Sequence, residues 1–312
     1  MSEVDSTKEA EYEVVMGSTG FLPGTPQSAH VAPAKKFKRR YKGFRLGFWV
    51  SIGWLALVSL LAIFAGLLPF VKPYAKTYDD CGGAGPGAAH WLGCDNIGRD
   101  LFSRIAYGGQ VSLFIGLMVV VLAIAVGGTV GLLAGYYRGK TDSVITMLVD
   151  TILAIPPLIL LLFVVIVLGQ NLKNIIIAVG ILAIPTTARI VRANTMVYAE
   201  REFVTAARVL GAKNRRIIWR EVLPNVIPPL ISYTFLAVGI IIVVEGILSF
   251  LGASVPPPRP TWGKIIAEGR TQLDVHPLVA ILPGLVIFFT VLSLNFISDS
   301  LSEKFNVREA GI

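Results

Sequence analysis

The sequence predicts an all-α polytopic membrane protein with six transmembrane helices, and three observations support this fold class. First, 54% of the 312 residues are hydrophobic and only 15% are charged, whereas a soluble domain carries about a quarter charged residues. Second, the apolar residues are concentrated in runs long enough to cross about 30 Å of hydrocarbon, which takes about 20 helical residues. Third, the frequency of Lys and Arg alternates between successive segments that flank these runs.

The apolar runs divide the chain into a membrane domain and two tails. The six runs cover residues 46–70, 111–137, 143–169, 174–191, 226–251 and 277–298. The first run starts after residue 45, so we do not expect it to be an N-terminal signal peptide. Residues 1–45 are expected to form a largely disordered tail that ends in a basic membrane anchor. Residues 46–305 then form the membrane domain, and residues 306–312 form a C-terminal tail.

The positive charges predict how the chain is oriented in the membrane. Lys and Arg are more frequent before the first run and after the second, fourth and sixth runs than in the other flanks. Because cytoplasmic loops carry the excess of Lys and Arg, both termini and the loop 200–225 are predicted to be cytoplasmic. The loops 71–108 and 252–276 are predicted to be external. The net charge of +8 follows from this topology and from attraction to anionic lipid, so no nucleic-acid partner is expected.

The first external loop contains both cysteines of the chain, Cys81 and Cys94. The external face permits disulfides, and a bridge at this spacing stabilises a loop by roughly 3 kcal/mol in the chain-entropy model. The sequence leaves a bridge and two free thiols as open alternatives. Further along this loop, Asp95 or Asn96 is expected to cap a short helix.

The second apolar run carries a stripe of small residues. Gly127, Gly131 and Gly135 recur at four-residue spacing. Small residues at this spacing allow a second helix to approach closely, which favours packing where lipid removes the hydrophobic incentive. The stripe therefore predicts a helix–helix contact.

Two acidic residues are candidates for a role inside the membrane: Asp150 in the third run and Glu245 near the end of the fifth. An acid at depth costs about 2.5–3.5 kcal/mol on insertion scales, so both are expected to face protein or water. For Asp150 the sequence leaves open an interhelical hydrogen bond and a position in a translocation path. Pro156 and Pro157, near the middle of the third run, predict a bend.

The segment after the fifth run is rich in proline and is predicted to be an external re-entry or lid segment. Pro256, Pro257 and Pro258 are expected to be extended and solvated. Trp262 is interpreted as an anchor at the membrane interface.

Patterns that suggest enzymatic or nucleotide-binding sites fail on closer reading. Residues 134–141 look like a phosphate loop, but an alanine stands where the pattern needs glycine and a membrane helix precedes it. Residues 107–110 resemble part of an ATPase signature, but they lie near the external face. The histidines, His30, His90 and His276, are isolated, and no metal-ligand spacing is present. We therefore expect no catalytic residue, metal or cofactor in this chain.

The segment 202–225 is short, basic and amphipathic in a chain that is otherwise mostly apolar. Phe203, Ala206, Ala207 and Leu210 recur at i, i+3, i+4 and i+7, which places them on one face of a helix. A membrane channel or carrier has no internal need for such a segment. We therefore expect something outside the bilayer to bind it.

Gly211 is expected to end this helix in the left-handed conformation. A second short helix follows over residues 212–221, and Leu223 and Pro224 lead into the fifth membrane helix. The sequence thus predicts two short helices at an angle, with a knuckle of small residues that fits a groove on a partner. The alternative is an amphipathic hairpin that lies on the lipid surface.

The spacing of Ala206, Ala207 and Gly211, followed by Leu223 and Pro224, resembles the cytoplasmic "EAA" loop of ATP-binding-cassette importer permeases. The external loop is similar to a signature of the second permease of dipeptide, oligopeptide and nickel importers. Its residues are Gly93, Asp95, Gly98, Arg99, Asp100, Ser103 and Arg104. The stretches 150–156 and 248–252, with Trp262 and Gly263, are similar to further motifs of this family. The resemblance covers roughly residues 45–305.

Three positions depart from the family pattern. Thr205 stands at the glutamate position that gives the loop its name, and Glu221 stands where an apolar residue is usual. Cys94 replaces a threonine of the family, so a bridge to Cys81 is a feature of this protein.

The resemblance implies a type I ATP-binding-cassette importer permease fold in a bacterial cytoplasmic membrane. It also implies four kinds of partner: a second homologous permease, two cytoplasmic ATPases that hold ATP and magnesium, an external substrate-binding protein, and membrane lipid. The loop would couple to the ATPases, and peptides would be the substrates, with nickel, haem or another small solute as alternatives.

A stand-alone, ion-coupled secondary transporter is the alternative from a different class. It would need buried coupling acids in paired broken helices. The sequence shows one deep acid, Asp150, and no inverted repeat, which favours the importer permease.

Overall fold

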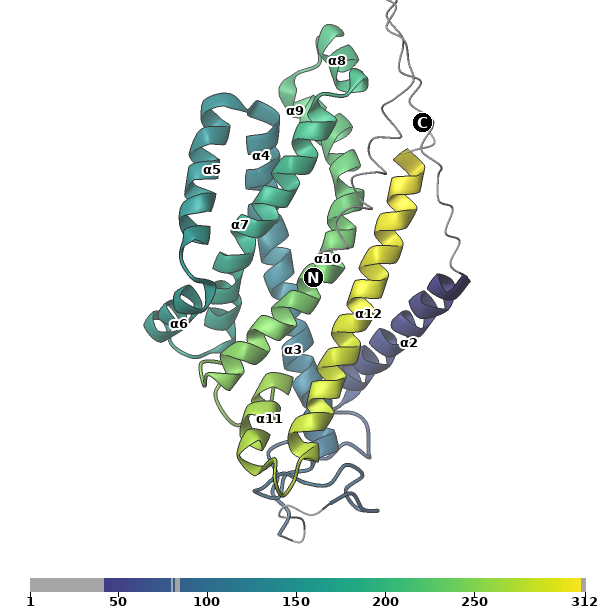
Figure 1. Ribbon diagram of the computed structural model, residues 1–312, viewed down its shortest axis with the longest axis vertical. Coiled ribbons are helices and arrows are strands. Elements are labelled where there is room, and N and C mark those ends of the chain that lie inside the picture. The colour runs from purple at the N-terminus through teal and green to yellow at the C-terminus, as the bar shows by residue number, and fades with distance from the viewer. Residues whose placement is uncertain (1–41, 80, 82–84, 310–312) are drawn as a thin grey trace, which may run out of the picture. The chain divides into compact units, whose positions relative to one another are not determined.

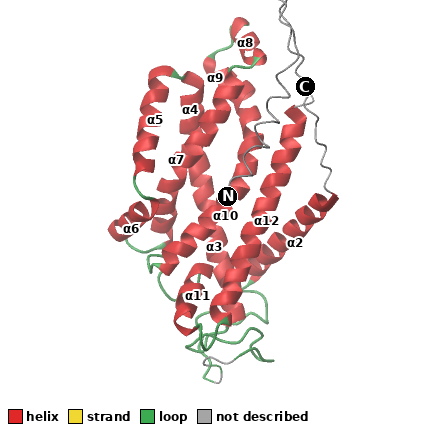
Figure 2. Ribbon diagram, viewed as in Figure 1, coloured by secondary structure: helices red, strands yellow, loops and turns green. Residues whose placement is uncertain are grey.

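The computed structural model describes residues 42–79, 81 and 85–309. The expected N-terminal tail and most of its basic anchor lie outside these residues. In the described part the chain is helical apart from turns and loops, and two isolated β-bridges join Thr77 to Arg99 and Cys94 to Asp100 (Figure 2). The all-α fold class is therefore confirmed.

The helices are labelled as in Figure 1. They are α2 (Lys42–Phe64), α3 (Leu101–Ala123), the π-helical turn η1 (Ile124–Gly128), α4 (Thr129–Tyr137), α5 (Gly139–Ala154), α6 (Pro157–Leu168), α7 (Leu172–Ala199), α8 (Glu202–Val209), α9 (Asn214–Ile217), the π-helical turn η2 (Ile218–Val222), α10 (Leu223–Phe250), α11 (Trp262–Gly269), the 3-10 turn η3 (Arg270–Gln272) and α12 (Leu278–Glu309).

Within the part of the chain that the structure describes, five continuous helices are long and apolar enough to cross a membrane. They are Leu46–Phe64, Leu101–Tyr137, Leu172–Ala199, Asn214–Phe250 and Leu278–Phe305. The third predicted run is instead a broken pair, since α5 and α6 meet at 87°. The break falls at Pro156 and Pro157, which remove two amide donors, so the bend expected there is present.

The two ends of the helix bundle differ. Figure 1 shows α8 and the turn between α4 and α5 at one end, and α11 with the 65–100 loop at the other. The first of these is called the cytoplasmic end below, and the second the external end, after the orientation that the positive charges predict.

Three expectations about where helices begin and end are wrong. The second membrane helix begins at Leu101 and not near 111, because Asp100 caps it by accepting a hydrogen bond from the Ser103 amide at 2.8 Å. No separate short helix capped by Asp95 or Asn96 forms. The second short helix expected after Gly211 is also not separate, because α9, η2 and α10 form one helix from Asn214 to Phe250.

The predicted glycine stripe lies against α7. A Cβ atom added at Gly127 would lie 2.4 Å from the carbonyl oxygen of Ile184, and one at Gly131 would lie 2.3 Å from that of Ala188. At Gly135 the distance to the Arg192 oxygen would be 2.7 Å. No side chain fits at such distances, so these glycines allow the two backbones to touch.

A cluster of buried apolar side chains fills the external half of the bundle, where α2, α3, α11 and α12 meet around Trp262. Trp262 is buried and donates from Nε1 to the Ile105 oxygen at 2.9 Å, so its interpretation as an interfacial anchor is wrong. Gly108 and Gly109 of α3 make room for its ring, because a Cβ at either would lie 3.1–3.2 Å from it. The residues that suggested an ATPase signature therefore have a packing role.

We predict that Gly131→Ala destabilises the protein by roughly 1–3 kcal/mol, because the added methyl group forces α4 away from α7. Gly128→Ala is the matched control in the same segment, since its Cβ would meet nothing closer than 3.7 Å. Thermal unfolding of the two purified variants in detergent measures the difference. Equal unfolding midpoints would contradict the packing argument.

Candidate functional site

The cytoplasmic end presents α8 beyond the ends of α7 and α10 (Figure 1). Val204 is the residue of α8 that is buried, and it packs in a cluster with Val191 of α7, Ile217 and Val222. The predicted apolar face did not include Val204. One buried side chain thus attaches α8 to the helices that lead into the membrane.

The predicted apolar face points mostly to solvent. Phe203 is 39% exposed and Leu210 is 87% exposed, while Ala206 is exposed and Ala207 is half-buried. Val209 adds a further apolar side chain that is 82% exposed. Apolar groups this accessible on a short helix are typical of a surface that another protein covers.

Gly211 ends α8 as expected, with a φ of +79°. The Gly211 amide donates to the Arg208 oxygen and the Ala212 amide to the Ala207 oxygen, both at 3.0 Å. These two bonds end the helix. They require the left-handed backbone conformation at Gly211, which glycine adopts more readily than other residues. Beyond them, Leu223 is half-buried beside the Val204 cluster and Pro224 is exposed in the first turn of α10.

The flank of this loop is strongly basic. Four cations line a shallow hollow together with the exposed Trp219: Lys213, Arg215, Arg216 and Arg220. The loop is held to its neighbours by polar contacts. Tyr136 donates to Asn214 Oδ1 at 3.0 Å, and Arg138 pairs with Glu200 at 2.6 Å. The cytoplasmic end thus offers a knuckle, formed by Ala206 and Ala207 with exposed apolar side chains beside them, next to a basic surface.

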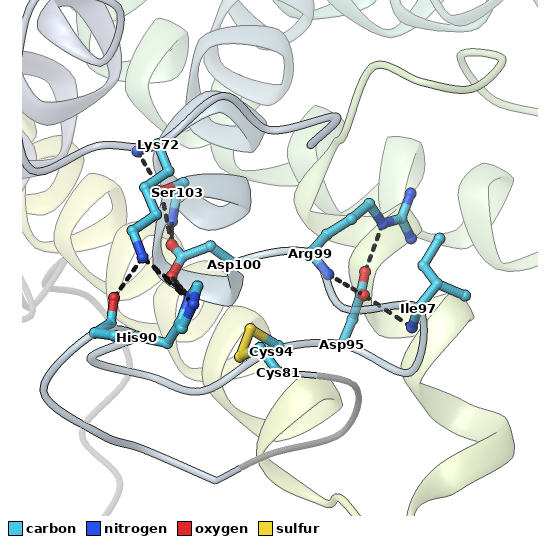
Figure 3. The surroundings of a disulfide bond; sticks show 10 residues. Lys72, Cys81, His90, Cys94, Asp95, Ile97, Arg99, Asp100 and Ser103 are labelled. Atoms are coloured by element: carbon cyan, nitrogen blue, oxygen red, sulfur yellow. Dashed lines mark hydrogen bonds and ion pairs between the residues drawn. A yellow bond between two sulfur atoms is a disulfide. The ribbon is translucent and has the colours of Figure 1, made fainter. Parts of the chain in front are cut away.

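The external family motif folds into a network of buried charges, part of which Figure 3 shows. Asp95 is fully buried and accepts from the backbone amides of Ile97 at 3.1 Å and Arg99 at 2.8 Å. It also accepts from Arg99 Nε at 2.6 Å and from Arg104. Glu268 of α11 pairs with the same two arginines, at 2.8 Å and 2.7 Å. The network joins the loop, α3 and α11.

A second polar group surrounds Asp100. Its carboxylate accepts from Ser103 and lies 2.8 Å from His90 Nδ1. Lys72 donates from its amide to Ser103 Oγ at 2.8 Å, and its ammonium lies 3.4 Å from the His90 ring (Figure 3). His90, which is isolated from the other histidines in the sequence, therefore has polar partners in the fold. The histidine is buried and fixes the loop to the N-terminus of α3.

Cys81 and Cys94 form a disulfide with their Cα atoms 5.8 Å apart. Both sulfurs lie within 4.8 Å of His90, but the bond between them removes the thiolates that a metal ion would need. Nearby, Gly98 has a φ of +80°, and a Cβ there would lie 2.5 Å from the Tyr78 oxygen. Gly93 also has a positive φ, of +77°, and accepts from the Leu101 amide.

Glu245, a predicted intramembrane candidate, is buried near the external end of α10. Ser249 and Ser254 each donate to its Oε1 at 2.7 Å, and Ser112 of α3 lies 3.5 Å from its Oε2. Ser112 also accepts from the Trp262 amide at 3.2 Å. The carboxylate therefore joins α10, α3 and the segment before α11 at one point.

The other intramembrane candidate, Asp150, pairs with Arg189 of α7 at 2.6 Å. This is an interhelical contact of the kind that the sequence left open. A second pair, Asp142 with Arg192, joins the same two helices nearer the cytoplasmic end.

Residues 127–309 match the family model described as the binding-protein-dependent transport system inner membrane component. The chain belongs to this family. The permease is similar to the glutathione transport system permease protein GsiD of Pectobacterium atrosepticum, with 38% identity over 92% of this chain and 95% of that protein. It is 37% identical to the dipeptide transport system permease protein DppC of Alkalihalophilus pseudofirmus, over 92% of this chain and 93% of that protein.

Solved structures support the fold of the permease. An inward-facing structure of the MetNI methionine ABC transporter is similar to this chain, with a TM-score of 0.57 and 18% identity. The match covers 66% of this chain and 97% of the chain in that structure. The permease is thus a multi-pass inner-membrane protein with the fold of ATP-binding-cassette importer permeases.

Four functional or structural residues escaped the sequence interpretation: Val204, His90, Glu268 and Arg189. Each of them contacts a partner on another helix or loop segment, at least ten residues away in the sequence. Glu268, for example, pairs with arginines more than 160 residues earlier in the chain. No local pattern predicts such a pair. The one usable signal was the acid itself, since Glu268 lies on a short amphipathic helix, and Arg99 lies in, and Arg104 just after, a loop of the same external side.

We predict that Asp95→Ala destabilises the permease by about 3–5 kcal/mol, because it removes the fully buried acid of the network and leaves two largely buried arginines with only the partly exposed Glu268. Glu268→Ala is the control at the other end of the network. Its side chain is 27% exposed and Asp95 still serves both arginines, so we expect a loss of about 1 kcal/mol. Thermal unfolding in detergent ranks the variants. A larger loss for Glu268→Ala would overturn the view of Asp95 as the centre of the network.

Proposed function

We propose that this chain is a membrane-spanning permease subunit of an ATP-driven importer for di- or oligopeptides. It forms half of the translocation path and couples to cytoplasmic ATPases through the loop 202–225. The observation that carries this proposal is the exposed apolar knuckle of α8, which is joined to the membrane helices through Val204. Relatives named for glutathione and dipeptide transport support the substrate class.

The proposed complex holds this permease, a second homologous permease, two ATPases that bind ATP and magnesium, and an external substrate-binding protein. In this proposal the chain itself is non-catalytic and carries no cofactor. The long exposed surface of α5 and α6 supports a second permease as partner. Among the described residues, α5 has none that is buried and α6 has two, Leu161 and Val165.

The external end supports docking of a binding protein. Its loop is held by the disulfide and by the Asp95 and Asp100 networks, so its surface is fixed before any partner arrives. A preorganised surface loses less conformational entropy on binding than a flexible one. The exposed Pro256–Pro258 segment belongs to the same end of the permease.

We predict that Ala206→Arg lowers both peptide uptake and the ATPase activity stimulated by the loaded binding protein by about tenfold or more, because a long charged side chain prevents α8 from seating in the ATPase. Thr141→Arg is the matched control, since it adds the same side chain at an exposed position of the cytoplasmic end. Both variants are assayed as complete complexes in liposomes. Normal coupling in Ala206→Arg with normal assembly would refute the role of the knuckle.

We predict a different pattern at Gly211, where the backbone and not the space is limiting. No atom lies within 4 Å of a Cβ added there, but the φ of +79° disfavours branched side chains. Gly211→Asn should therefore retain most coupling, because asparagine tolerates this conformation. Gly211→Val should lose it. Equal coupling in the two variants would show that the left-handed turn does not matter.

The substrate class is tested by uptake in the same liposomes. ATP-dependent accumulation of labelled dialanine or glutathione supports the proposal. Accumulation of nickel or haem without peptide would reassign the substrate, and uptake by the chain alone under an ion gradient would reject the importer mechanism.

A further inference from the structure

We propose that Asp150 of α5 and Arg189 of α7 bind the charged ends of a peptide as it passes through the permease. Arg189 takes the carboxylate of the peptide, and Asp150 takes its ammonium group. This site rests on the peptide-import function proposed above and adds to it a specificity-determining pair inside the membrane domain.

The pair is accessible at a depth where charges do not face lipid. The side chain of Arg189 is 58% exposed and that of Asp150 is 54% exposed. At a rise of 1.5 Å per residue, Arg189 lies about 15 Å from the cytoplasmic end of α7. Charged groups at such depth face a bundle interior or a water-filled cavity. The exposed surface of the pair therefore belongs to a path or an interface.

Two cavities lie near this pair, one lined by the pair itself and the other lined by residues one helical turn away. One of about 230 Å³ lies between α4, α5 and α7 and is lined by Asp150, Arg189 and Arg192. The other, of about 200 Å³, lies between α3, α5, α7 and α10 and includes Thr186 and Leu153. Thr186 lies one helical turn from Arg189 on α7, and Leu153 lies one turn from Asp150 on α5. The pair thus stands between a polar cavity and an apolar one.

The apolar cavity suits the body of a peptide. Apart from Thr186, Thr187 and Tyr233, its lining residues are apolar. The hydroxyl groups of Thr187 and Tyr233 lie 3.5 Å apart, so hydrogen-bonding groups are available to a peptide backbone. A peptide held by its ends at Asp150 and Arg189 would place its side chains in this cavity.

The pair also keeps bonding capacity for a ligand. A single contact, from Arg189 Nη2 to Asp150 Oδ1, joins the two side chains in the described structure. A guanidinium has five N–H donors and a carboxylate has two oxygens, so most of their capacity remains free. A zwitterion that inserts between them replaces one ion pair with two.

The neighbouring pair shows what a purely structural contact looks like. Arg192 binds Asp142 with two parallel hydrogen bonds, and Asp142 also accepts from Thr146 at 3.3 Å. These side chains are only 29% and 17% exposed. Asp142 and Arg192 therefore hold α5 against α7, whereas Asp150 and Arg189 remain open to a ligand.

The test uses the complete complex with Thr186→Cys in this permease. Both native cysteines of the chain are in the disulfide, so Cys at 186 supplies its one free thiol. Thr186 is exposed and lies beside Arg189. We measure how fast a water-soluble maleimide modifies this thiol, with and without millimolar dialanine. We expect dialanine to slow the modification by about tenfold, and N-acetyl-dialanine amide, which lacks both end charges, to have no effect.

The second residue change assigns the effect to the pair. Added to Thr186→Cys, Arg189→Gln should abolish protection by dialanine. Lys140→Gln is the matched control, because it also removes one positive charge but at an exposed position of α5 outside both cavities, and it should leave the protection intact. Protection is the ratio of the modification rates without and with peptide in each variant, so a change in the intrinsic reactivity of the thiol on loss of a neighbouring cation does not affect the comparison. Protection that survives Arg189→Gln, or that the blocked peptide gives equally well, would overturn the proposed site.

Uptake by the wild-type complex separates this inference from the function on which it rests. If dialanine accumulates in liposomes with ATP but does not protect the thiol at position 186, the site is wrong and peptide import stands. If no peptide accumulates, peptide import itself fails. Uptake should also fall about tenfold in Arg189→Gln with an unchanged KM for the loaded binding protein, because docking occurs elsewhere.

Discussion

The contact between the backbones of α4 and α7 is the constraint on which the rest of the permease depends. Three glycines spaced by four residues face three carbonyl groups of α7 at distances that admit no side chain. The first of them, Gly127, lies in the π-helical turn between α3 and α4, where the wider turn alters the register of the helix. This contact fixes the rotation of α7. Because one side of α7 is used for it, Arg189 and Arg192 project toward α5.

The two ends of the permease differ in how completely their side chains are paired and buried. At the external end, polar groups are buried and paired: Asp95 and Glu268 serve two arginines, and Asp100 holds His90 and Ser103. Such a network is strongly destabilised when one partner is removed, so it defines one geometry. At the cytoplasmic end, apolar side chains such as Leu210 remain in solvent. In the proposed complex, the rigid external surface would contact the binding protein, and the exposed apolar side chains at the cytoplasmic end would be covered by an ATPase.

Much of this architecture could be predicted from the sequence, because the relevant signals are local. The apolar runs gave the membrane helices, the glycine stripe gave a packing face, and Pro156 with Pro157 gave the break between α5 and α6. The errors came from residues whose environment is set at long range. Trp262 looked interfacial, yet two glycines of α3 make a buried space for it. The start of α3 was misplaced because the apolar run begins only near residue 111, whereas the helix extends back to Leu101 and Asp95 neutralises its buried Arg104.

The position of Val204 explains how the loop and the membrane domain act as one body. Its cluster includes Leu132 of α4, Val191 of α7 and Val226 of α10, so a force on α8 reaches three membrane helices at once. Close-packed side chains transmit such displacement with little loss. Two of these helices, α4 and α7, line the polar cavity beside Asp150 and Arg189. In the proposed mechanism, movement of α8 by the ATPases therefore changes the separation of α5 and α7, and the affinity of the open ion pair for a peptide changes with it.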